Sequence, residues 1–112
     1  MSIELISYGL KHGPLLRDVD HSYDARHLPN PYKMIALRDL DGRDPRVSHV
    51  VFGSTESWDF LGNILDNVMS DDVKTISVYC YGGHHRSVAV VEELAASLRI
   101  MKKDVKVTHR DI

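Results

Sequence analysis

The segment between Cys80 and Ser87 combines residue types that can hold an oxyanion. A β-rich apolar run, residues 75–81, leads into a pair of glycines, and an apolar-periodic run from residue 88 follows an arginine and a serine. At such a strand–glycine turn–helix junction, several backbone N–H groups and the positive end of the helix dipole point at one place. A guanidinium, a hydroxyl and an imidazole add further donors. The sequence therefore predicts a phosphate-binding loop formed by Gly82, Gly83, His85, Arg86 and Ser87.

The same loop also offers a nucleophile. Its spacing C-x-x-G-x-x-R-S, from Cys80 to Ser87, resembles the signature loop of cysteine-dependent protein tyrosine phosphatases. In such a loop a thiolate at the helix N-terminus attacks phosphorus while the arginine, here Arg86, holds the phosphate. A general acid is also required, and no motif selects one among the available aspartates, Asp18, Asp20 and Asp24. Two observations argue against this chemistry: a strand-end cysteine commonly packs as a small apolar residue, and Tyr79 stands where that family has histidine. A phosphatase is therefore the alternative, and a binding function is the main expectation.

Histidine is abundant, with seven residues in a chain of 112, which raises the question of a metal site. A zinc site needs three or four ligands that converge on one point. His84 and His85 open a helix, where adjacent side chains point apart, so this pair would supply at most one ligand. We therefore expect no metal, with His85 donating a hydrogen bond to the oxyanion and His84 facing outward.

Composition and charge exclude several broad classes of protein. With 43% apolar and 27% charged residues, the chain can bury a core as one globular domain and is not disordered. A single cysteine excludes a disulfide framework and fits a reducing, cytoplasmic setting. The sequence contains no apolar run of 18 residues, so no membrane segment is expected. The net charge of −2 argues against a dedicated nucleic-acid binder.

Strands and helices must position this loop. Alternating or apolar runs predict strands at residues 3–8, 22–26, 75–81 and 105–109, with a loop at 11–20. Helices are predicted at residues 45–51, from residue 54 or 55 onward, and at 88–101. The second of these should bury Trp58, Leu61, Leu65 and Val68, and the third Val88, Val91, Leu94, Ala95 and Leu98. The order predicts a small single-domain α/β sandwich with a mainly parallel sheet, whose ligands bind at the carboxyl ends of the strands.

Four ordered motifs resemble one protein family. They are Lys11-His12-Gly13, the segment DARHLPNPY from Asp24 to Tyr32, the segment GGHHRSV from Gly82 to Val88, and His109-Arg110. In this order they resemble the C-terminal domain of RapZ, the RNase adapter family, over nearly the whole chain. Residues 1–112 are therefore expected to form a single RapZ C-terminal-like domain.

The resemblance implies a binding and sensor domain for a phosphorylated amino sugar, such as glucosamine-6-phosphate or a UDP-amino sugar. It implies neither an established catalytic activity nor a cofactor. By matching position, the loop at residues 82–87 would cradle the phosphate, Lys11 and His12 would line the cleft, and Asp24 and Arg26 would reach the sugar. Asp24 and Arg26 lie two residues apart on an extended segment and therefore face the same way, so an ion pair between them is the alternative to contacts with the sugar. Tyr81 replaces the family's threonine in the cradle, which removes a hydroxyl and adds an aromatic ring where the sugar is expected.

The resemblance also implies an RNA partner. In the family this domain follows a P-loop nucleotide-binding domain and binds small regulatory RNAs. An RNA contact here would use the basic C-terminal region, Lys102, Lys103, Lys106 and Arg110, with Arg99 beside it. A solvated helix end that complements the helix dipole is the other interpretation of this cluster. The expected partners are thus a phosphate-bearing small molecule and RNA, with self-association as a homo-oligomer left open.

Overall fold

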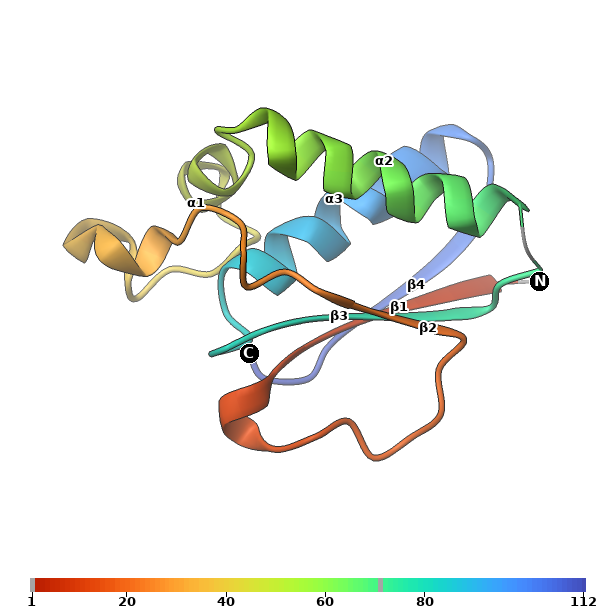
Figure 1. The fold of residues 1–112 in the computed structure, drawn as a ribbon, viewed down its shortest axis with the longest axis horizontal. Helices are drawn as coiled ribbons and strands as arrows, with labels where there is room; N and C mark the ends of the chain where they lie inside the picture. The colour runs from red at the N-terminus through yellow and green to blue at the C-terminus, as the bar shows by residue number, and fades with distance from the viewer. Residues whose placement is uncertain (1, 71) are drawn as a thin grey trace.

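The computed structural model describes residues 2–70 and 72–112, and within them four parallel strands form one sheet in the order β2–β3–β1–β4. The strands are β1 (Ser2–Gly9), β2 (His21–Asp24), β3 (Thr75–Cys80) and β4 (Asp104–His109). The helices are α1 (Pro45–Val51), α2 (Thr55–Ser70) and α3 (Arg86–Ile100). Helices α2 and α3 cover one face of the sheet (Figure 1), and α1 packs against α3. The predicted α/β sandwich is confirmed, with a sheet that is parallel throughout.

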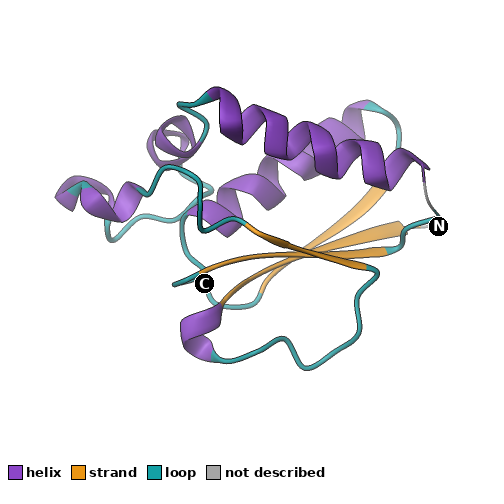
Figure 2. Ribbon diagram, viewed as in Figure 1, coloured by secondary structure: helices purple, strands orange, loops and turns teal. Residues whose placement is uncertain are grey.

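Alternation along the strands explains these layers. Leu5 of β1 and Ile76 and Val78 of β3 are fully buried beneath the helices. The residues that alternate with them along each strand point to the other face of the sheet, where the rings of Tyr8 and Tyr79 lie 5.4 Å apart. The segment between β1 and β2 runs across this second face and is mostly loop (Figures 1 and 2). The loop predicted at residues 11–20 is therefore confirmed, except that a short 3₁₀ turn, η1 (Leu10–His12), opens it.

Helix α3 connects strand β3 with the edge strand β4. These two parallel strands flank β1, and the helix packs against all three. The side chains predicted for its inner face are all buried: Val88, Val91, Leu94, Ala95 and Leu98. The helix ends in a Schellman turn, in which the Lys103 N–H donates to the Leu98 carbonyl at 3.0 Å and the Lys102 N–H to the Arg99 carbonyl at 3.0 Å. Lys102 adopts a φ of 66°, the left-handed conformation that this turn requires.

The predicted inner face of α2 is wrong at Trp58. The buried side chains of this helix are Ser57, Leu61, Ile64 and Val68, and Leu65 is only partly buried against the core. Trp58 is 50% exposed, and its ring lies 4.8 Å from that of Phe52, whose carbonyl accepts a hydrogen bond from the indole N–H. The indole therefore covers the connection between α1 and α2 instead of entering the core.

Two strand boundaries also differ from the prediction. Strand β2 ends at Asp24, whose carboxylate accepts the Arg26 N–H at 2.9 Å and turns the chain. Strand β3 ends at Cys80, so Tyr81 lies outside the sheet and is 59% exposed, although the apolar run predicted it inside. The chain turns here because Gly83 adopts a φ of 74° shortly before α3 begins.

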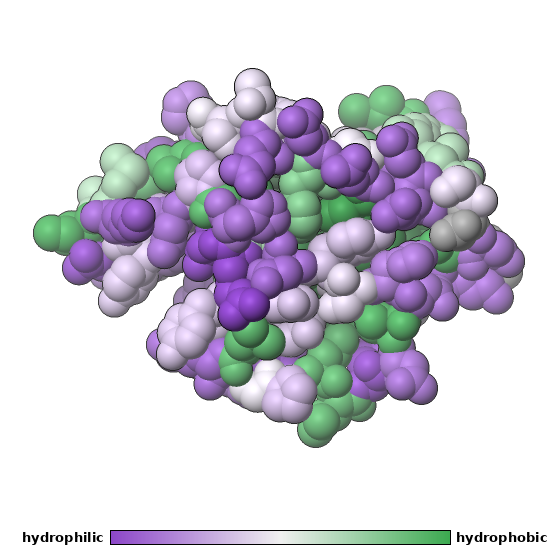
Figure 3. Space-filling model, viewed as in Figure 1, coloured by the Kyte–Doolittle hydropathy of each residue, from purple (hydrophilic) through white to green (hydrophobic). Residues whose placement is uncertain are grey.

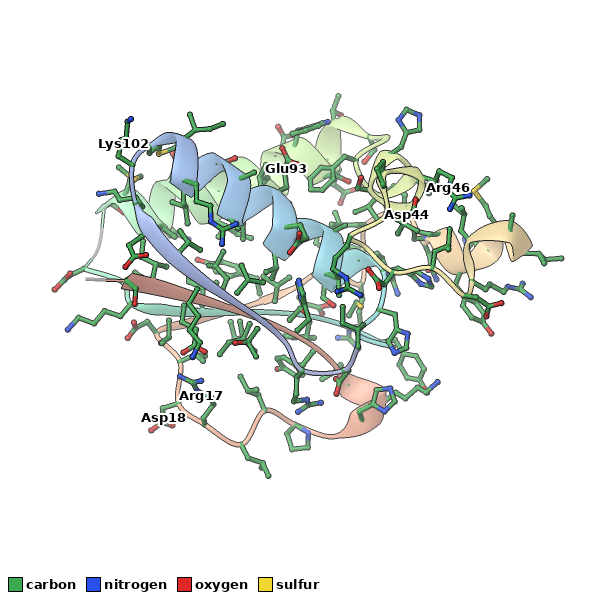
Figure 4. The ribbon with its side chains drawn as sticks, turned by 180° about the vertical axis from the view of Figure 1, so that it is seen from behind. Arg17, Asp18, Asp44, Arg46, Glu93 and Lys102 are labelled. Atoms are coloured by element: carbon green, nitrogen blue, oxygen red, sulfur yellow. The ribbon has the colours of Figure 1, made fainter. Side chains whose placement is uncertain are left out.

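Helix α1 spans the predicted residues 45–51, and Asp44 caps its start. The Asp44 carboxylate accepts the Arg46 N–H at 2.9 Å and pairs with the Arg46 guanidinium, and Pro45 occupies the first helical position (Figure 4).

On the face shown in Figure 3, hydrophobic residues lie at the tip formed by residues 31–37, on the loop below the sheet and at the far end of α3. Exposed apolar residues in these segments include Ile35 and Leu16. In the described ranges 2–70 and 72–112, no helix has the length and apolar character needed to span a membrane.

Candidate functional site

The predicted phosphate loop borders a cavity of about 460 Å³. Three segments that are distant in sequence meet here: residues 80–86 at the carboxyl end of β3, Lys11 of η1, and residues from the stretch 30–38. A volume of this size lies within the range of about 300–1,000 Å³ that is typical of ligand sites. The cavity is lined by Lys11, Asn30, Tyr32, Arg38, Cys80, Tyr81, Gly82, Gly83, His84, His85 and Arg86.

Close backbone contacts among three glycines, Gly9, Gly82 and Gly83, fix the wall of this cavity. A Cβ atom placed on Gly83 would lie 2.5 Å from the Gly9 nitrogen, and one placed on Gly9 would lie 2.3 Å from the Gly82 carbonyl carbon. The Gly9 N–H also donates to the Asp111 carboxylate at 2.7 Å. Burial opposes ionisation of Asp111, but hydrogen bonds from Arg110 and from Gly9 outweigh it and hold the pKa of this carboxyl below its ordinary value. The end of β1 is thus clamped against the glycine turn.

Positively charged groups surround the cavity. Arg86 opens α3 and donates through Nη1 to the carbonyl of Arg26. Arg38 donates through Nε to the carbonyl of Tyr32 at 2.7 Å, and the backbone N–H of Lys11 donates to the Tyr81 carbonyl at 3.0 Å. A guanidinium has five N–H donors, so each arginine is anchored by one and retains others for a ligand.

Both neighbouring histidines line the cavity, and His84 does so from the solvent-exposed side that the sequence predicted for it. His85 is buried, and its Nε2 donates to the Leu37 carbonyl at 3.1 Å. This bond ties the loop to the 3₁₀ turn η3 (Ile35–Leu37) and occupies one of the two ring nitrogens of His85, the residue expected to donate to the oxyanion. His84 is exposed, and its ring lies 6.1 Å from that of His12 in a nearly parallel arrangement. His12 therefore lies beside a lining residue, His84, but does not itself line the cavity as predicted.

Ser87 lies beneath the loop and not in the cavity. It is fully buried, and its hydroxyl oxygen lies 3.2 Å from the Cys80 sulfur. The Gly83 N–H donates to the same sulfur at 3.3 Å. Cys80 is 2% exposed, as expected for a strand-end thiol, yet it forms part of the cavity floor.

Asp24 and Arg26 form an ion pair with each other. The Arg26 Nη2 lies 2.7 Å from an oxygen of the Asp24 carboxylate, and the Arg26 Nε donates to both oxygens at 3.0 Å. The hydrogen bonds from the Arg26 side chain hold the pKa of Asp24 below its ordinary value. Neither side chain lines the cavity. The pairing left open in the sequence is therefore the observed arrangement, and Arg26 contributes its carbonyl as the anchor of Arg86.

The predicted basic region is divided between two ends of the molecule. Lys102 and Lys103 are exposed in the turn after α3, at the end of that helix away from the cavity (Figure 4), and Lys106 is exposed on β4. Arg110 lies at the other end of β4, where it pairs with Asp111 and donates to the Gly13 carbonyl at 2.9 Å. RNA binding by the three lysines stays a prediction.

Sequence reasoning missed three lining residues. Asn30 and Tyr32 stand in a recognised motif, in which the flanking prolines indicated only a turn for Asn30. The side-chain carbonyl of Asn30 does accept the Tyr32 N–H at 3.2 Å. Arg38 stands in no motif, and no pattern in the sequence signals it.

The cavity has the chemistry of an anion site. Its described lining includes the cations Lys11, Arg38 and Arg86 and two imidazoles, and it includes no carboxylate. The first N–H groups of α3 also lack partners within that helix and add positive potential at Arg86. In the part of the chain that the structure describes, no three histidine, cysteine, aspartate or glutamate side chains are grouped to hold a metal ion.

Comparison with known proteins places the chain in a family. The profile of the RapZ C-terminal domain matches residues 1–112. Similar proteins include a nucleotide-binding protein of Finegoldia magna, 39% identical over 120 residues, which cover 99% of this chain and 42% of the relative. A nucleotide-binding protein of Thermodesulfovibrio yellowstonii is 40% identical over 121 residues, 99% of this chain and 42% of the relative.

A third relative, a nucleotide-binding protein of Corynebacterium diphtheriae, is 43% identical over 118 residues, 95% of this chain and 38% of the relative. The chain thus spans about two fifths of the length of these curated relatives. The match along the whole sequence agrees with the four ordered motifs, and this chain belongs to the RapZ C-terminal domain family.

Proposed function

We propose that this domain binds a phosphorylated small molecule, an amino-sugar phosphate or a nucleotide-linked amino sugar, in the cavity beside residues 82–86. The observation that carries the proposal is the charge of the lining: three cationic side chains and a helix N-terminus face a cavity whose described lining has no carboxylate. Charged hydrogen bonds from arginine match the oxygens of a phosphate. The name of the relatives, nucleotide-binding protein, fits a phosphate-bearing ligand.

The sugar contacts differ from those that the family resemblance implies. Because Asp24 and Arg26 are paired outside the cavity, polar contacts to a sugar fall to Asn30 and Lys11, which line it. An amide and an ammonium can both donate to sugar hydroxyls. A protonated amine on the sugar would meet no carboxylate among the described lining residues, so the phosphate contributes most of the affinity.

Isothermal titration calorimetry tests the proposal with glucosamine-6-phosphate, UDP-N-acetylglucosamine, inorganic phosphate and, as a ligand without phosphate, glucosamine. A hydrogen bond to a charged group contributes about 1.5–3 kcal/mol, so Arg86→Ala should weaken binding of the phosphorylated ligands by about 10- to 150-fold. The control is Arg46→Ala, which removes an exposed arginine of α1 paired with Asp44. The proposal fails if no phosphorylated ligand binds at millimolar concentration, or if Arg86→Ala binds as tightly as the control.

A cysteine phosphatase is the second candidate, favoured by the surroundings of Cys80. Its sulfur forms part of the cavity floor, accepts the Gly83 N–H and lies beside the Ser87 hydroxyl. Both groups would stabilise a thiolate that attacks phosphorus. The aspartates considered as general acid do not line the cavity: Asp20 binds the backbone of Lys74, and Asp18 lies on the loop across the other face of the sheet (Figure 4).

An aryl phosphate with a good leaving group requires little acid catalysis, so p-nitrophenyl phosphate is the suitable substrate. If the domain is a phosphatase, it releases p-nitrophenol with steady turnover, and Cys80→Ser abolishes the release while the protein still binds phosphate. No release above that of the Cys80→Ser variant would exclude this candidate.

A further inference from the structure

Two exposed tyrosines lie on the wall of the cavity. Tyr32 and Tyr81 both line it, yet 56% and 59% of their surfaces are exposed to solvent. Aromatic rings left this open in a concave site offer flat apolar faces beside the phosphate-binding groups. Tyr81 also stands where the resemblance leads one to expect threonine, so this aromatic face is a property of this chain.

The backbone around both rings is held in place. The Asn30 amide oxygen accepts the Tyr32 N–H at 3.2 Å, and the Tyr32 carbonyl accepts from Arg38. The Arg38 guanidinium carbon lies 4.7 Å from the centre of the Tyr32 ring. On the other side, the Tyr81 carbonyl accepts the Lys11 N–H. A tyrosine has only two side-chain torsions to fix, so rings on an anchored backbone lose little entropy when a ligand stacks on them.

We infer that Tyr81, with Tyr32, forms a stacking subsite for an aromatic ring joined to the bound phosphate, and that the ligand class is a nucleoside phosphate. This inference rests on the proposed phosphate site. A nucleobase stacks on an aromatic side chain whatever its hydrogen-bonding pattern, because every base has a flat π face. An arginine over the other face of such a ring, as Arg38 lies over Tyr32, strengthens the stack. A bare hexose phosphate would fill the cationic part of the cavity and leave the Tyr81 ring exposed.

Matched ligands test the inference by calorimetry. Ribose 5-phosphate carries the phosphate and sugar of a nucleotide but has no base, UMP adds a small ring and AMP a larger one. The wild-type protein should bind in the order AMP, UMP, ribose 5-phosphate, with AMP at least about fivefold tighter than ribose 5-phosphate, given the usual strength of base–aromatic stacking. Tyr81→Ala should weaken AMP binding about tenfold and change ribose 5-phosphate by less than twofold. Tyr81→Phe, which keeps the ring, should bind AMP like the wild type.

The outcomes separate this inference from the proposed function. Equal affinity for AMP and ribose 5-phosphate, both lost in Arg86→Ala, would overturn the stacking subsite and leave the phosphate site intact. Tighter binding of glucosamine-6-phosphate than of AMP would likewise overturn it. If Arg86→Ala binds all three matched ligands like the wild type, the phosphate site itself is refuted. Because Tyr81 is exposed, its replacement should leave the folded structure unchanged, which circular dichroism would verify.

Discussion

Replacing Gly83 with alanine should destabilise the fold far more than the same change at the adjacent Gly82. Gly83 has a φ of 74°, and an alanine in this left-handed region costs about 1–2 kcal/mol. The new Cβ would also lie 2.5 Å from the Gly9 nitrogen and 2.9 Å from the Gly9 Cα, so the two backbones must separate. Overpacking of this kind costs about 1–3 kcal/mol. The expected loss is therefore about 2–5 kcal/mol, a large share of the stability of about 5–15 kcal/mol typical of a domain.

Gly82→Ala is the matched control because it lies in the same turn. A Cβ atom at Gly82 would meet no described atom within 4 Å. Thermal unfolding followed by circular dichroism, with urea titration beside it, measures the difference. At about 4 °C of melting temperature for each kcal/mol, Gly83→Ala should melt at least about 8 °C below Gly82→Ala. Melting temperatures within about 2 °C of each other would refute the packing of the turn against the end of β1.

Three further changes test other parts of the fold. Leu94→Ala, at a fully buried position of α3, should cost about 2–5 kcal/mol in urea unfolding, whereas Leu16→Ala, 92% exposed, should change stability by less than about 0.5 kcal/mol; equal effects would contradict the assigned core. Lys102→Gly should stabilise the protein by about 0.5–1 kcal/mol, because glycine adopts the left-handed φ at the end of α3 without strain; a lower melting temperature would count against that turn. Hydrogen bonds from the backbone N–H groups of Lys74 and Thr75 hold the pKa of the Asp20 carboxyl below its ordinary value, so its contribution to stability is complete above about pH 5 and is lost as the pH falls. Asp20→Asn should therefore give a shallower loss of stability between about pH 5 and pH 2, and an unchanged acid limb would contradict this role.

The parts of the fold that depend on local sequence could be predicted. The spacing of apolar residues from Val88 to Leu98 defines the buried face of α3, since a helix that connects parallel strands must cover the sheet. Asp44 and Pro45 mark the start of α1 because a cap and a fixed φ act within a single turn. The glycine turn before α3 was likewise predictable from the order of residue types around Gly83.

Features that depend on contacts between separate elements of the fold could not be predicted. Hydrophobicity alone places Trp58 inside, but the Ser57 hydroxyl is buried instead because it donates to the Val51 carbonyl at 2.6 Å. Arg38 enters the cavity because residues 30–38 fold back on the loop, held there by the bond between His85 and the Leu37 carbonyl, 48 residues apart. No periodicity or motif in a single sequence encodes such a contact.

The motifs predicted most of the loop residues that line the cavity, but they did not predict where the Asp24 and Arg26 side chains lie. Gly82, Gly83, His85, Arg86 and Lys11 all line it, as the motifs suggested. Their roles in binding remain part of the proposal. Asp24 and Arg26 do not line the cavity, and a local ion pair joins them to each other.

The most direct test of the central claim is a two-dimensional ¹H–¹⁵N NMR titration with inorganic phosphate. If the cavity holds phosphate, the backbone amides of residues 82–87 should show the largest shifts and should saturate together, and Arg86→Ala should remove the saturating response. Shifts confined to the exposed lysines Lys102, Lys103 and Lys106, or amides at residues 82–87 that do not respond to millimolar phosphate, would contradict the claim.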